Sequence, residues 1–200
     1  KYPFFKLRQA DYQNVNTDLE KNYLLSSNLE NLKLSKSTTC LLIGINPRYE
    51  GSKLNLSLRS RYLKGNFNVI QIGSLLNLTF SSTNITSNTK TLKSLSEGNS
   101  IFCQEFTNSL YPITISNAEL FKRDDALCLI NMLNFLNKHV NIFSQSINQD
   151  QLNILSATIN DVGFMNFNYF KPIKKKDFKN SIGVYFVQNS FSTPNIKKLL

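Results

Sequence analysis

Short apolar runs separated by polar turns predict four strands along the chain. The predicted strands are residues 40–45 (CLLIGI), 67–72 (FNVIQI), 111–115 (YPITI) and 181–187 (SIGVYFV). The first run is unbroken and ends at Asn46-Pro47, which is typical of a strand buried on both faces. In the third run, Pro112 is tolerable only at the beginning of a strand because proline has no N–H for the ladder.

Between these runs, apolar residues recur at the three- and four-residue spacing of amphipathic helices. Helices are predicted around residues 54–63, 92–95, 101–106, 124–140 and 152–159. The longest opens with Asp124-Asp125, whose acidic side chains suit the positive end of a helix dipole. The Ser/Thr/Asn tract at residues 81–89 predicts a loop.

Strands that alternate with helices predict the α/β class, a Rossmann-like parallel sheet with helices on both faces. The pattern divides the chain into an N-terminal extension that leads into the domain (residues 1–39), the Rossmann-like α/β domain (residues 40–190) and a basic tail (residues 191–200). Sheets of this kind place their ligands at the carboxyl ends of their strands. That edge is therefore where chemistry is expected.

The composition says more about the gene than about the fold. The 200 residues include 27 Asn but only 4 Ala, although Ala is the best helix former and Asn is a poor one. Asn, Lys, Ile and Phe have A/T-rich codons, which indicates an A/T-biased genome such as that of an organelle or a parasite. The same bias explains much of the net charge of +10, so charge alone does not predict a nucleic-acid partner.

Several classes of protein are excluded by the sequence. No stretch approaches the roughly 20 consecutive apolar residues of a membrane-spanning helix. The first residues, KYPFFKLRQADYQ, resemble neither a signal peptide nor a mitochondrial presequence. Three cysteines without CxxC spacing argue against a disulfide framework or a zinc site, and favour a reducing compartment. The single His139 leaves no room for a multi-histidine metal site.

No phosphate-binding loop of the GxGxxG or GxxxxGK[ST] type follows any predicted strand. The first strand does lead into residues 44–50 (GINPRYE), where an Asn-Pro turn could present backbone amides and the Asn46 side chain to a ligand. The simpler alternative, which we favour, is a turn that redirects the chain into a helix, with Arg48 and Glu50 pairing locally. Both interpretations stay open from spacing alone.

No catalytic, cofactor-binding or metal-binding residue is predicted. A GxSxG nucleophile elbow is absent, and a histidine at a helix end, such as His139, is more often structural than catalytic. Asp124 and Asp125 are adjacent at a helix start, where capping is a more common role than acid–base catalysis. The cysteines lie in or near apolar runs, as small buried hydrophobic residues do, and are Cys40, Cys103 and Cys128.

Residues 164–180 (FMNFNYFKPIKKKDFKN) interleave aromatic and basic side chains, as single-stranded nucleic-acid binders do. No recognisable RNA-binding motif accompanies them, and they lead directly into the predicted strand at 181–187. A solvated loop on a basic protein is therefore the favoured interpretation of this segment.

Three ordered segments carry a resemblance to a known family. The chain resembles the carboxyl-terminal, molybdopterin-oxidoreductase-like region of the largest peripheral-arm subunit of respiratory complex I, the NuoG-type subunit. The similar segments are residues 46–50 (NPRYE) followed by Leu54-Asn55, Arg59 and Arg61; residues 72–73 followed by Leu76 and Leu78-Thr79; and residues 98–100 with Phe102, followed by residues 123–126 (RDDA). A looser similarity starts at residues 16–32 and reaches the strand at 181–187. The sequence departs from the family at Asn55-Leu56, where the family has Asn-Ala.

The resemblance implies a molybdopterin-oxidoreductase-like domain that keeps the fold without the metal site. Its role would be structural, in the matrix arm of NADH:ubiquinone oxidoreductase, and it would belong to an enzyme only as a subunit. No cofactor is implied for this chain, because the iron–sulfur clusters and FMN would belong to partner subunits, including an iron–sulfur-bearing chain. No nucleic acid is expected as a partner.

The resemblance also implies a location on the matrix side of the mitochondrial inner membrane, reached through the complex. The chain looks like a split or truncated piece of the subunit, which suits a mitochondrially encoded product. Two alternatives stay open. One is an enzymatic fragment that still holds a pterin nucleotide at Asn46-Pro47, and the other is a nucleic-acid-binding or organellar ribosomal module that uses residues 164–180.

Overall fold

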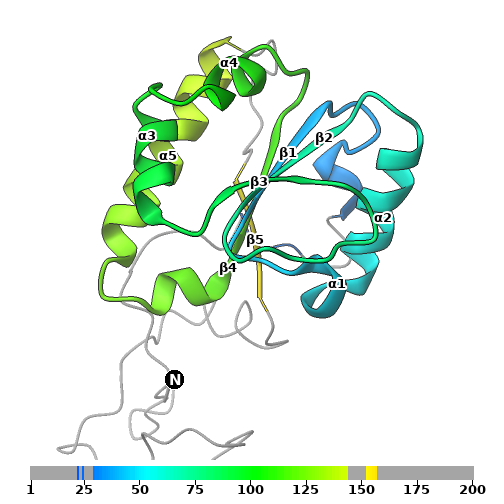
Figure 1. Cartoon of the computed structure of the whole chain (residues 1–200), viewed down its shortest axis with the longest axis horizontal. Coiled ribbons are helices and arrows are strands. Elements are labelled where there is room, and N and C mark those ends of the chain that lie inside the picture. Colours follow the sequence, from blue (N-terminus) through cyan, green and yellow to red (C-terminus); the bar gives the residue numbers. More distant parts are fainter. Residues whose placement is uncertain (1–21, 23, 25–28, 144–151, 157–200) are drawn as a thin grey trace, which may run out of the picture.

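The computed structural model describes residues 22, 24, 29–143 and 152–156, and its centre is a five-stranded sheet (Figure 1). Every strand pair is parallel, and the strand order is β3-β2-β1-β4-β5. The strands are β1 (Thr39–Ile43), β2 (Asn68–Ile72), β3 (Thr83–Thr86), β4 (Ile113–Asn117) and β5 (Leu152–Leu155). At the β5 edge, the Leu24 N–H donates to the Ile154 carbonyl at 2.8 Å.

Helices cover both faces of the sheet, which confirms the predicted fold class (Figure 1). The helices α1 and α2 lie on one face, and α3, α4 and α5 lie on the other. The helical elements are the 3-10 helix η2 (Leu29–Leu32), α1 (Pro47–Glu50), α2 (Ser52–Leu63), α3 (Thr89–Ser96), α4 (Phe102–Thr107), the 3-10 helix η3 (Ala118–Lys122) and α5 (Ala126–Phe143).

The central strand β1 supplies both cores, because successive side chains of a strand point to opposite faces. Leu41 and Ile43 pack into the core under α3, α4 and α5, while Cys40 and Leu42 pack into the core under α2. All five residues of β1 are buried. An apolar run with no alternation is therefore what this position requires, as the sequence indicates.

The chain reverses its direction across the sheet after β3. It first moves outward from β1 to β2 and β3, and it then crosses to β4, which pairs with the other side of β1. The connections that leave β1 and β4 therefore diverge at the carboxyl ends of these two neighbouring strands. This topological switch point is the place where open α/β sheets usually bind ligands.

Two predicted elements are wrong. Residues 81–89 were expected to be a loop, but Thr83–Thr86 form β3 at the sheet edge, where exposed polar side chains are compatible with a strand. Residues 152–159 were expected to be a helix, but Leu152–Leu155 form β5. Leu152 and Ile154 are buried two positions apart, which is the period of a strand and was mistaken for helical spacing.

The other predicted elements within the described residues are confirmed, with a shift in the third strand. That strand begins at Ile113 rather than at residue 111, because Tyr111 has a positive φ of 48° and Pro112 has no N–H. The strand expected at 181–187, the segment 164–180 and the tail 191–200 lie outside the described residues, and the domain division stays a prediction. Within the part that the structure describes, no helix combines the length and apolar character needed to cross a membrane.

The α2 helix provides a matched test of the core under it. Leu58 is completely buried against the sheet, whereas Leu56 on the same helix is 66% exposed. We expect Leu58→Ala to lower the free energy of unfolding of the full chain by about 2–5 kcal/mol, because it leaves a cavity. Leu56→Ala should change it by less than about 0.5 kcal/mol. Urea unfolding of both variants measures this, and equal effects would contradict the packing of α2.

Candidate functional site

Two glycine turns pack against each other at the carboxyl edge of the sheet. Gly44 follows β1 with φ +59°, and Gly73 follows β2 with φ +145°, both in backbone regions that favour glycine. A Cβ atom on Gly73 would lie 3.5 Å from the backbone Cα and N of Gly44. The Gly44 N–H donates to the Ile72 carbonyl at 2.9 Å, so the sheet continues into the first turn.

In the turn after β1, the backbone N–H groups at the start of α1 donate to Asn46. The Asn46 side-chain oxygen accepts from the Arg48 N–H at 3.2 Å, and the Asn46 carbonyl accepts from the N–H groups of Tyr49 and Glu50 at 3.1 and 2.9 Å. Pro47 begins α1 and has no N–H to offer. Asn46 is therefore a helix cap, and this agrees with the simpler interpretation of the motif.

The turn after β4 is closed in the same way by Asn117. Its side-chain oxygen accepts from the Glu119 N–H at 2.9 Å, which caps η3. Its side-chain amide donates to a carboxylate oxygen of Glu50 at 3.1 Å. Asn117 thus joins the two turns across the switch point.

The switch point carries two carboxylates rather than a phosphate-binding cradle. Partial burial raises the pKa of Glu50, a hydrogen bond from the Asn46 backbone N–H to its carboxylate lowers it, and the nearby Glu119 charge raises it. Glu119 in turn accepts from the Lys122 ammonium at 2.7 Å. Two carboxylates therefore lie beside the turns, together with two cations: Lys122, which is paired with Glu119, and Arg48.

The predicted pairing of Arg48 with Glu50 is wrong: neither of these two described side chains binds the other. A guanidinium N–H of Arg48 instead donates to the Asn77 carbonyl at 3.3 Å, and the guanidinium lies 5.8 Å from the centre of the Tyr49 ring. Asn77 belongs to the segment that connects β2 to β3. Arg48 therefore fastens this connection over α1.

Two polar residues on the α2 side of the sheet were missed by the sequence analysis. Gln71 in β2 is buried with both amide atoms unbonded within the described protein, and the buried Asn55 on α2 has an unbonded side-chain oxygen. The Asn55 amide donates to the Thr79 hydroxyl at 3.3 Å. A glutamine inside the apolar run 67–72 was the available signal, since buried polar side chains usually have partners.

The candidate nucleophiles and metal ligands are dispersed. Cys40 is fully buried in β1, where burial raises the pKa of its thiol well above the ordinary value. Cys103 is half-buried on α4 and its thiol lies 3.4 Å from the Leu95 carbonyl, while Cys128 is exposed on α5, contrary to the expectation that all three are buried. His139 lies within α5. No group of three or more His, Cys, Asp or Glu side chains within the described residues is placed to hold a metal ion.

Asp125 precedes α5 and is engaged in an ion pair. Both of its carboxylate oxygens accept from the Arg123 guanidinium, at 2.7 and 2.8 Å. This bidentate hydrogen bond lowers the pKa of Asp125 and raises that of Arg123. The pair keeps a negative charge at the start of the helix, where the dipole favours it, and the side chain is not arranged for proton transfer.

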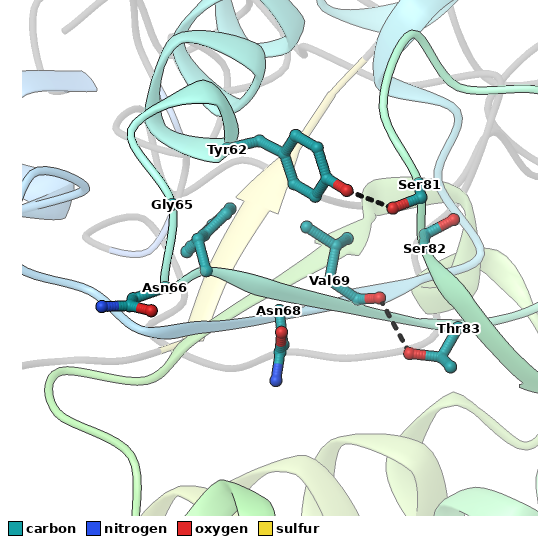
Figure 2. A pocket seen from close by; sticks show the side chains of 9 residues that line it. Tyr62, Gly65, Asn66, Asn68, Val69, Ser81, Ser82 and Thr83 are labelled. Atoms are coloured by element: carbon teal, nitrogen blue, oxygen red, sulfur yellow. Dashed lines mark hydrogen bonds between the residues drawn. The ribbon is translucent and has the colours of Figure 1, made fainter.

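A cavity lies at the opposite edge of the sheet, where β2 and β3 begin (Figure 2). Its volume is about 590 Å³. Its lining is neutral, and the Tyr62 and Ser81 hydroxyls bond each other across it while Thr83 donates to the Val69 carbonyl at 3.2 Å. This cavity therefore does not coincide with the switch point.

Comparison with known proteins identifies relatives over most of the chain. A family model described as molybdopterin oxidoreductase matches residues 2–199. The NADH-ubiquinone oxidoreductase 75 kDa subunit of Reclinomonas americana is 35% identical over 148 residues, which are 74% of this chain and 21% of that protein. The G subunit of the NADH-quinone oxidoreductase from Rickettsia felis is 25% identical over 175 residues, which are 88% of this chain and 25% of that protein.

The chain thus spans about a quarter or less of the length of these curated relatives. Among solved structures, a formyltransferase/hydrolase complex from Methylorubrum extorquens matches with a TM-score of 0.42 and 10% identity, over 63% of this chain and 37% of that chain. A structural likeness this weak carries no argument about function.

The capping role of Asn117 can be tested by mutation. Asn117→Ala removes both the acceptor for the Glu119 N–H and the donor to Glu50, so we expect a loss of about 0.5–2 kcal/mol in the free energy of unfolding. Asn99→Ala is the matched control, because Asn99 is exposed and its side chain caps no described helix. Thermal or urea unfolding of the full chain measures the difference. Equal stabilities of the two variants would contradict the bridge between the turns.

The raised pKa of Glu50 has a consequence for the pH dependence of stability. The folded protein holds this proton to a higher pH than the unfolded chain does. Neutral Glu50 therefore contributes to the free energy of unfolding in full below the ordinary glutamate pKa. This contribution is lost as the pH rises through the raised pKa of the folded protein. We expect Glu50→Gln to flatten this decline, because glutamine can still accept from Asn117. Urea midpoints between pH about 4 and about 8 measure it, and an unchanged slope in the variant would show that another group titrates.

Proposed function

Because this chain belongs to the molybdopterin oxidoreductase family, we propose that it is a non-catalytic structural part of the matrix arm of NADH:ubiquinone oxidoreductase, respiratory complex I. In this role it supports electron transfer from NADH to ubiquinone, coupled to proton translocation, without reacting itself. The observation that carries the proposal is the 35% identity with a complex I 75 kDa subunit over 74% of the chain.

The switch point supports a structural role because it does not fit a pterin nucleotide. The pyrophosphate of such a cofactor needs free backbone amides or cations. Here the amides of Arg48, Tyr49 and Glu50 are bound within the Asn46 turn, and Pro47 has none. The carboxylates of Glu50 and Glu119 would also repel the phosphates. The amides at the start of α1 are therefore already used and are not available to such a group.

The cysteines give no better support for a metal centre. Transition metals bind the thiolate form, and the buried Cys40 thiol has a raised pKa that disfavours it. Cys103 lies on α4, which precedes β4, and Cys128 lies on α5, which follows it, so the two thiols come from different elements. We propose that the chain holds no cofactor of its own, and that iron–sulfur clusters and FMN belong to partner subunits.

The proposed location is the matrix side of the mitochondrial inner membrane, and the proposed partners are other matrix-arm subunits, including an iron–sulfur-bearing chain. Two observations support this. The composition, with 27 Asn and 4 Ala, fits an A/T-rich organellar gene, and the relatives include complex I subunits from Reclinomonas americana and Rickettsia.

Blue-native electrophoresis of detergent-solubilised mitochondria from the source organism tests this proposal. We expect peptides of this chain in a high-mass band that oxidises NADH and contains iron–sulfur subunits. Mass spectrometry of excised bands identifies the peptides, and a matrix enzyme outside any complex is the control. Recovery with ribosomal proteins, or only as a free monomer, would contradict the proposal.

A further inference from the structure

The helix α2 carries leucines on both of its sides. Leu54 and Leu58 are 2% and 0% exposed and pack against the sheet. Leu56 and Leu63 are 66% and 73% exposed, and their spacing of seven residues puts them on one outward stripe. The other outward positions of α2 hold serine, lysine and arginine, so the two leucines form an apolar stripe between polar side chains.

A groove of about 360 Å³ runs beside this stripe, between α2 and the segment that precedes β1. Leu56 from α2 and Leu34 from the preceding segment supply its apolar surface. Serines from both segments complete much of the lining. The helix α2 lies on the face of the sheet opposite α3 and α5 (Figure 1). The groove is called the α2 groove below.

The charges around the α2 groove have one sign. Among the described residues, the charged side chains that line the groove are Lys53, Arg61 and Lys64, and none is acidic. Arg61 is held in place because its guanidinium donates to the Ser37, Gly65 and Asn66 carbonyls at 3.0, 2.6 and 3.1 Å. The exposed Arg59 adds another positive charge on α2. The surface is therefore an apolar stripe within a basic rim.

We propose that the α2 groove binds an acidic amphipathic helix of a protein partner. The distance along α2 between Leu56 and Leu63 is about 10 Å, two turns, which matches the repeat of apolar side chains on a facing helix. Glutamates and aspartates beside that apolar stripe would face the basic rim, which favours correct pairing and faster association. A concave groove suits an inserted side chain better than a flat lipid surface.

This inference rests on the surface of α2 and goes beyond the proposed function. It holds for any assembly in which the chain works. If the α2 groove did not bind the peptide, the chain could still co-migrate with NADH-oxidising activity. The peptide-binding experiment and the electrophoresis therefore test the two proposals separately.

The test uses the purified full chain and a fluorescent peptide of about 20 residues, with leucines at helical i, i+3, i+4, i+7 spacing and glutamates elsewhere. We expect this peptide to bind, and Leu56→Asp to weaken binding at least about tenfold. Leu127→Asp is the matched control, since Leu127 is 60% exposed on α5, and it should bind as the unchanged chain does. A peptide with lysine in place of every glutamate should bind at least about tenfold more weakly, and added salt should weaken the acidic peptide.

Lys64→Glu is a second variant that alters the rim without touching the leucines, and circular dichroism checks that each variant folds. We expect it to weaken the acidic peptide and to strengthen the lysine peptide. Equal binding of the two peptides, or equal loss in Leu56→Asp and Leu127→Asp, would overturn the proposal. Tighter binding to phosphatidylserine vesicles than to the acidic peptide, lost in Leu56→Asp, would also overturn it and assign the surface to lipid.

Discussion

The strand β1 is buried on both faces, and the other strands and the helices are arranged around it. Its five residues are all buried, and β1 pairs with β2 on one side and β4 on the other. Because the strand order is β3-β2-β1-β4-β5, the chain leaves β1 and β4 in opposite directions at the same edge. The polar turns at that edge must then be satisfied locally, and two asparagines, Asn46 and Asn117, do this with their side chains.

The asparagine-capped turns distinguish this sheet from similar sheets that bind a ligand at the switch point. An open α/β sheet offers a ligand the free amides at its switch point. Here the amides of Arg48, Tyr49, Glu50 and Glu119 are used inside the turns, and two carboxylates lie beside them. The features that point outward are instead on α2, with its exposed leucines and basic rim.

The sequence was sufficient for the elements whose patterns are set by burial, such as β1 and α5. It failed at β3 and β5, because an edge strand of Thr and Asn has no apolar run, and because Leu152 and Ile154 show their two-residue period over only four residues.

The cap at Asn46 was foreseeable from the Asn-Pro pair. Its bridge through Glu50 to Asn117 was not, since these two residues are 67 positions apart and only the β1–β4 pairing brings them together. Cys128 was misplaced because helical periodicity gives a face only approximately.

We propose that the closed switch point leaves this domain without a pterin nucleotide in its working assembly. The most direct measurement is the amount of pterin released by acid from the native assembly that contains the chain, quantified by mass spectrometry against the amount of the chain itself. We expect far less than one pterin per chain. One pterin per chain, retained through purification, would contradict the claim and would mean that the turns at Asn46 and Asn117 open to admit the cofactor.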